Sequence, residues 1–150
     1  MAPIMIAPLL IGASAGLAAG AVMTFLSHIA PQFGAGNFIR DMDRPVFFSR
    51  ELSRREAHYI GILMHLAFAL LAGLLFAFAL DRHWVPAFAF LPIVGWSFIL
   101  FLVIGLILLP LEGHGFFGSK HDAWFPVDLL LTCLGWGGLF YLFMQLWIPR

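Results

Sequence analysis

Residues 59–80 read YIGILMHLAFALLAGLLFAFAL, and this stretch decides how the chain folds. Apart from the imidazole of His65, it holds no acidic or basic side chain. A helix needs about 20 apolar residues to cross the ~30 Å of hydrocarbon in a lipid bilayer. The stretch therefore predicts one helix that spans a membrane.

Three other apolar blocks of comparable length occupy most of the remaining chain, at 4–30, 84–111 and 123–148. Overall, 62% of the residues are hydrophobic and 11% are charged. A soluble domain typically has about 45–50% apolar and about 25% charged residues. The sequence predicts an all-α fold in which residues 1–150 form one polytopic domain, a bundle of four transmembrane helices. We expect these helices at about 4–30, 53–80, 85–110 and 124–148.

Basic residues are distributed unequally between the two ends of such a bundle. Two of the eight, Arg82 and Arg150, fall on the side of the termini. The other six fall in or beside the two connections of the opposite side: Arg40, Arg44, Arg50, Arg54, Arg55 and Lys120. Lysine and arginine in short loops are retained in the cytoplasm. This predicts cytoplasmic loops at 31–52 and 111–123, with both termini outside.

Small residues recur at four-residue spacing in the first two predicted helices. Gly12, Gly16 and Gly20 lie on one ridge of the first helix, and Gly73 belongs to a similar ridge of the second. Small side chains let two helix backbones approach closely, which in lipid replaces the missing hydrophobic driving force. We predict that these glycines make the first two helices the closest pair. The same ridge is equally suited to contact a second protomer.

Five of the six histidines are predicted at the cytoplasmic end of the bundle. His28 ends the first helix, His58 begins the second, and His65 lies about 10 Å deeper at 1.5 Å per residue. Ionisable side chains at such depth usually face the bundle interior and pair. One interpretation is a cofactor site formed by His65, His58 and His28, which would hold a metal, haem or quinone. The other is a neutral His65 hydrogen-bonded to a carbonyl or hydroxyl group of a facing helix.

The connection between the third and fourth helices reads PLEGHGFFGSKHD at 110–122. With the start of the fourth helix it supplies imidazole and carboxylate groups, which suit a divalent transition metal. The candidate ligands are Glu112, His114, His121 and Asp128. Loop histidines on a surface, a salt-bridged Glu112 and an Asp128 that stabilises a helix N-terminus would explain the same residues without a metal.

The glycines at 113, 115 and 118 permit backbone conformations that other residues avoid. Together with Phe116 and Phe117 they predict a compact re-entrant turn that dips aromatic side chains back into the membrane interface. Irregular backbone at that depth must be buried by protein or wetted by a cavity. We therefore expect the turn to be packed against the first and second predicted helices.

Two segments carry a resemblance to known proteins: MHLAFALLAG at 64–73 and the pattern P-x-x-G-x-G-F-F-G at 110–118. Over roughly residues 5–145 the chain resembles small uncharacterised bacterial four-helix inner-membrane proteins. The resemblance implies a four-helix fold and a location in the bacterial inner (cytoplasmic) membrane, but no activity. Such proteins often carry a histidine in the fourth helix, whereas LLLTCLGWGG at 129–138 has none.

Two functional interpretations follow from these features. The first is a non-catalytic inner-membrane protein, embedded in lipid, that packs against other membrane subunits or against copies of itself. The second is a membrane-embedded binding module that uses the His, Asp and Glu residues for a metal, haem or quinone. The sequence requires no cofactor and does not establish an enzyme. A net charge of zero provides no basic surface for nucleic acid.

Overall fold

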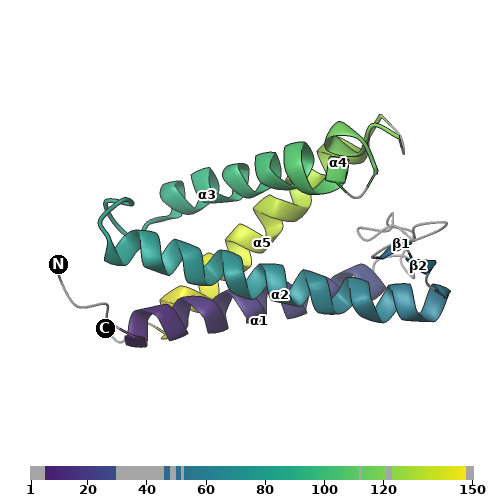
Figure 1. The fold of residues 1–150 in the computed structure, drawn as a ribbon. Helices are drawn as coiled ribbons and strands as arrows, with labels where there is room; N and C mark the ends of the chain where they lie inside the picture. The colour runs from purple at the N-terminus through teal and green to yellow at the C-terminus, as the bar shows by residue number, and fades with distance from the viewer. Residues whose placement is uncertain are drawn as a thin grey trace.

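The computed structural model describes residues 6–29, 46–47, 50–51, 53–111, 113–120 and 123–147 (Figure 1). The helices are α1 (Ile6–Ile29), α2 (Arg54–Asp81), α3 (Phe90–Val103), the π-helical turn η2 (Ile104–Leu108), α4 (Leu109–Leu111), the 3-10 turn η3 (Phe116–Gly118) and α5 (Phe125–Trp147). A two-residue antiparallel pair, β1 (Val46–Phe47) and β2 (Arg50–Glu51), precedes α2.

Four helical segments among the described residues are long and apolar enough to cross a membrane. They are Ala7–Ser27, His58–Asp81, Phe90–Leu111 and Phe125–Trp147. The third combines α3, η2 and α4, which follow one another without a break. The predicted all-α bundle of four spans is confirmed, and these segments indicate a multi-pass membrane protein.

The start of α2 follows from local chemistry. The backbone N–H of Ser53 donates to Oε2 of Glu56 at 3.0 Å, and the N–H of Glu56 donates to Oγ of Ser53 at 3.3 Å. This reciprocal pair satisfies two N–H groups that the first helical turn would leave unbonded. Ser53 and Glu56 thus form a capping box, which starts α2 where the predicted helix 53–80 begins.

The third span starts later than expected, at Phe90 instead of residue 85. His83 has a positive φ of 57°, which ends α2, and the N–H groups of Trp84 and Val85 both donate to the carbonyl of Ala79 at 2.9 and 3.3 Å. Pro86 then keeps the chain out of the helix, because a residue that precedes proline is disfavoured in the α conformation. Residues 84–88 form bends instead.

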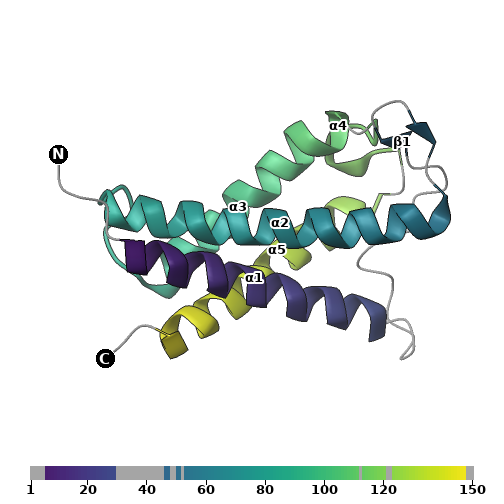
Figure 2. The same cartoon turned by 60° about the horizontal axis from the view of Figure 1, so that its bottom comes forward.

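The bundle is built on an antiparallel α1–α2 pair with α5 crossing it, as Figures 1 and 2 show. α5 contacts both α1 and α3, whereas the consecutive helices α2 and α3 make no extensive contact. Aromatic rings join the elements at the centre: Trp136 stacks on Phe140 with centroids 5.0 Å apart, and Phe140 meets Phe76 edge-on at 5.5 Å. All three rings belong to the buried core.

The helix ends gather at two ends of the bundle (Figure 1). The start of α1, the turn between α2 and α3 and the end of α5 lie at one end. The end of α1, β1, β2, the start of α2, α4 and the start of α5 lie at the other. The helix ends that lead into 31–52 and 111–123 therefore share one end, which agrees with the predicted topology. Its placement on the cytoplasmic side stays a prediction.

Candidate functional site

The α1–α2 contact is made by backbone against backbone. A Cβ atom added to Gly12 would lie 2.7 Å from the carbonyl oxygen of Gly73, and one added to Gly16 would lie 3.0 Å from the Cα of Gly73. From the other side, a Cβ on Gly73 would lie 2.9 Å from the Cα of Gly16. Side chains at these positions would force the helices apart, so the glycine ridge of α1 is occupied by α2 of the same chain.

α5 closes over this contact with a hydrogen bond. Nε1 of the buried Trp136 donates to the carbonyl oxygen of Gly16 at 3.3 Å. Three helices are thus joined at Gly16, which fixes the position of the residues one turn further along α1.

Gly20 marks the point at which the glycine ridge reaches His65. A Cβ on Gly20 would lie 4.0 Å from Nε2 of His65. The imidazole is half-buried, and its Nε2 is fully buried without a hydrogen-bond partner among the described residues. The carbonyl oxygen of Gly20 accepts the hydroxyl of Thr24 at 2.9 Å. The imidazole of His65 also interacts with the backbone of Gly20 on the facing helix. This interaction supports the interpretation of His65 as a histidine paired with a facing carbonyl group, although Nε2 forms no hydrogen bond of full geometry among the described residues.

His58 and His28 are not brought to His65 by the described structure. His58 is exposed near the start of α2, and its ring meets that of Tyr59 edge-on at 6.1 Å. The helix separates His58 from His65 by about 10 Å along its axis, whereas nitrogen ligands lie about 2 Å from a metal such as zinc. The backbone of His28 lies in the last turn of α1, but its side chain is outside the described residues.

Two of the four candidate metal ligands in and after the second connection lie among the described residues. Glu112 and His121 lie outside the described residues. His114 is half-buried and its N–H donates to the carbonyl of Leu109 at 2.8 Å, whereas Asp128 is exposed in the first turn of α5. No group of three His, Cys, Asp or Glu residues is placed to hold a metal within the described part of the chain. The metal site stays a prediction.

The turn at 113–120 folds back against helices, as its glycines predict, but its extensive contacts among the described residues are with η2, α4 and α5 and not with the first two helices. A short connection stays beside the two spans that it joins. Gly113, Gly115 and Gly118 have φ angles of 86°, 77° and 71°, and Phe117 shares this left-handed region with φ 51°. The Phe117 ring lies against Gly105, where a Cβ would overlap it, and its centroid is 5.0 Å from that of Phe101. Only one of the two phenylalanines packs inward, however, since the neighbouring Phe116 is exposed.

The widened turn η2 is a feature that the sequence analysis missed. The N–H of Leu109 donates to the carbonyl of Ile104, five residues back. The following residue, Pro110, has no N–H, and a proline ring inside a helix collides with the carbonyl four residues earlier. Widening one turn relieves such a collision, and it places Gly105 against the ring of Phe117. Pro110 at the end of an otherwise unbroken apolar run was the signal available in the sequence.

Comparisons of the sequence and the fold with known proteins found no significant similarity. No family model matches the sequence, no curated protein matches it significantly, and no solved structure matches the fold significantly. The resemblance to bacterial four-helix inner-membrane proteins consequently stays a prediction.

Proposed function

We propose that this chain is a non-catalytic integral membrane protein that acts as an accessory subunit, packing its outer helix faces against transmembrane helices of a larger complex. The proposal adds a partner and a role to the multi-pass membrane fold. It places the complex in the bacterial inner membrane, with 31–52 and 111–123 on the cytoplasmic side.

The supporting observation is a contrast between two groups of glycines. The space beside Gly12, Gly16 and Gly73 is filled by the facing helix of the same chain. Gly61 on α2, Gly95 on α3 and Gly138 on α5 are exposed, and a Cβ on any of them would meet no atom within 4 Å. Glycine lowers the stability of a helix interior, and small residues in transmembrane helices typically mark helix–helix contacts. Outward glycines on three helices therefore favour contact with other helices.

The test is purification in a mild detergent or in lipid nanodiscs, followed by measurement of particle mass and identification of co-purifying proteins. We expect a defined particle larger than the monomer. Gly61→Leu, Gly95→Leu and Gly138→Leu should each be compared with wild type, and at least one should release the partner while the monomer stays folded. A particle containing only this chain in several copies would replace the accessory subunit with a homo-oligomer. A monomer under all conditions would contradict the proposal.

His65 favours a second candidate, a membrane-embedded module for a metal, haem or quinone. Its buried Nε2 lies between α1 and α2, where the imidazole interacts with the backbone of Gly20 but Nε2 forms no hydrogen bond of full geometry among the described residues. Imidazole nitrogen is a ligand for transition metals and for haem iron. Elemental analysis and an absorption spectrum of the purified protein test this candidate, with His65→Ala as the comparison. A colourless, metal-free sample with the same properties in both forms would eliminate it.

A further inference from the structure

Three large apolar side chains are exposed in the segment between the end of the third span and the start of the fourth. Leu111, Phe116 and Trp124 are 79%, 64% and 72% exposed, and we refer to them as the interfacial patch. Leu111 is the last residue of the span Phe90–Leu111, and Trp124 directly precedes the span Phe125–Trp147. The interfacial patch therefore lies at the level where the hydrocarbon of a bilayer meets the lipid headgroups.

The turn at 113–120 folds back from this level toward the hydrocarbon. Phe117 contacts Gly105, which precedes Leu111 by six residues and thus lies about 9 Å inside the end of the span. On the other side of the turn, the ring of Phe125 occupies the space that a Cβ on Gly118 would need. The turn is held between α3 and α5 by these two rings, so its outer surface has a fixed direction.

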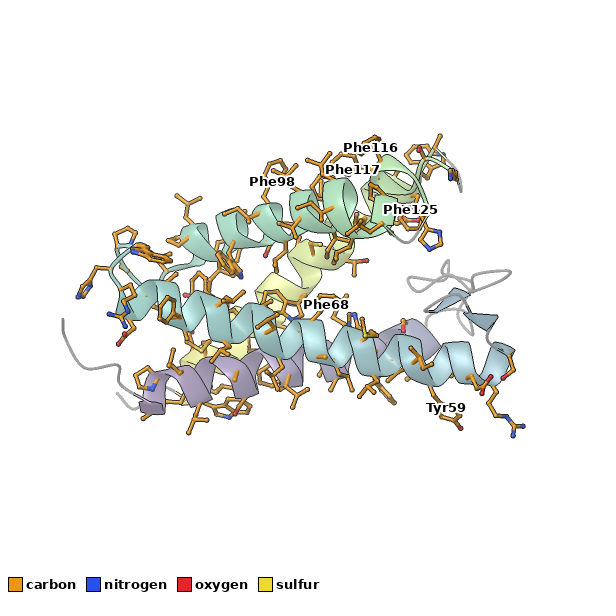
Figure 3. All side chains as sticks on the ribbon, viewed as in Figure 1. Tyr59, Phe68, Phe98, Phe116, Phe117 and Phe125 are labelled. Carbon is orange, nitrogen blue, oxygen red and sulfur yellow. The ribbon has the colours of Figure 1, made fainter. Side chains whose placement is uncertain are left out.

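Phe116 continues the outer surface of α3. Figure 3 shows Phe116 and Phe98 on the same side of α3, the side that faces away from α2. Phe98 is an exposed residue of the membrane-spanning part of α3. A side chain that continues this lipid-facing side near Leu111 is directed at the leaflet in which the span ends.

The end of the turn at Ser119 and Lys120 is polar. Most backbone polar groups of the turn form hydrogen bonds within the turn itself. Ser119 and Lys120 are exposed. Nζ of Lys120 donates to the carbonyl of Gly113 at 2.8 Å, and the N–H groups of Gly118, Ser119 and Lys120 donate to carbonyls within the turn at 3.0–3.2 Å. Irregular backbone is tolerated at the edge of the hydrocarbon only when its polar groups are paired in this way.

We propose that the turn at 113–120 is an interfacial lipid anchor, with Phe116 inserted among the upper acyl chains and Ser119 and Lys120 among the headgroups. Aromatic rings at this level stabilise a protein in the bilayer because their apolar bodies prefer the interface to water. Insertion of apolar side chains by about 5–10 Å is typical of interfacial segments. The anchor would fix the tilt and depth of α3, which among the described helices has α5 as its only extensive neighbour beyond its own continuation. The lipid anchor does not depend on the proposed role as an accessory subunit.

Spin labelling tests this anchor in the full-length chain. Cys133, the only cysteine, is first replaced by alanine, and single labels are then attached to Phe116→Cys or Ser119→Cys in phosphatidylcholine vesicles. Oxygen concentrates in the acyl region, whereas a nickel chelate stays in water. We expect the label at Phe116→Cys to collide more with oxygen than with nickel, and the label at Ser119→Cys to show the reverse. Leu111→Cys, from the same patch, should behave as Phe116→Cys does.

Two outcomes would overturn the anchor. A high nickel accessibility that is equal at positions 116 and 119 would place the whole turn in water. A label at position 116 shielded from both reagents would show that protein covers it, either a second copy or another subunit. Leu111→Cys reports the depth at which the span ends, so a label at position 116 that is clearly more accessible to nickel than the label at position 111 would also contradict the anchor.

Discussion

Replacing Gly16 by leucine tests the α1–α2 contact most severely. A Cβ at this position would lie 3.0 Å from the Cα of Gly73 and closer still to the carbonyl oxygen of Ala69. Both neighbours are backbone atoms, so no side-chain rotation relieves the overlap. The remaining atoms of a leucine side chain would have to enter the same space. The two helices must therefore separate, and the indole of Trp136 must leave the Gly16 carbonyl.

The expected loss can be estimated from these two effects. Overfilling a packed contact costs about 1–3 kcal/mol, and a hydrogen bond between membrane helices contributes about 0.6 kcal/mol. Together they lower the free energy of unfolding by about 2–4 kcal/mol. For a chain of 150 residues, each kcal/mol corresponds to about 2–4 °C in the melting temperature. Gly16→Leu should therefore melt about 5–15 °C below wild type.

The assay is thermal unfolding of the detergent-solubilised monomer, followed by the helical circular dichroism signal and by size-exclusion recovery after heating. Gly61→Leu is the matched control, because it makes the same change of residue in a transmembrane helix where a Cβ meets nothing within 4 Å. Comparison with this control removes the contribution of intrinsic helix propensity. A melting temperature of Gly16→Leu equal to that of Gly61→Leu would refute backbone packing between α1 and α2.

Further substitutions test other parts of the fold by the same melting assay. Gly105→Val should expel the Phe117 ring from α3 and lower stability by about 1–3 kcal/mol, and wild-type stability would show that the ring does not occupy this position. Ser53→Ala removes one partner of the capping box and should cost about 1 kcal/mol, whereas no loss would mean that the capping hydrogen bonds do not stabilise the start of α2. Trp136→Phe keeps the aromatic stack but removes the N–H donor to Gly16, so it should cost about 0.6 kcal/mol, and a loss of several kcal/mol would indicate that packing dominates.

The sequence predicts the spans and their order because length and apolar composition alone determine them. The capping pair of Ser53 and Glu56 also fixed the start of α2 correctly. The start of the third span was placed too early, because Pro86 and the left-handed His83 act against a helix that apolar composition would allow. The sparse contact between α2 and α3 was not predictable, since a helix that is apolar on all sides does not reveal which side packs.

The candidate site could be predicted only in part. The depth of His65 and its place on the small-residue ridge were readable from spacing, and the structure puts it beside Gly20. The separation of His65 from His58 by about 10 Å along α2 was also readable from their spacing, whereas the exposure of Asp128 depends on tertiary arrangement, which spacing does not give. The inward position of Phe117, with Phe116 outside, depends on the widened turn before Pro110. That turn is a local response to one proline and has no periodic signature.

The most direct test of the account is the sidedness of the chain in the membrane. Single cysteines at Arg55, His83 and Ser119, in a Cys133→Ala background, should be treated with a membrane-impermeant maleimide in intact cells and after permeabilisation. The account predicts that Arg55→Cys and Ser119→Cys react only after permeabilisation, whereas His83→Cys reacts in intact cells. Reaction of Arg55→Cys and Ser119→Cys from opposite sides of the membrane would contradict the four-span bundle.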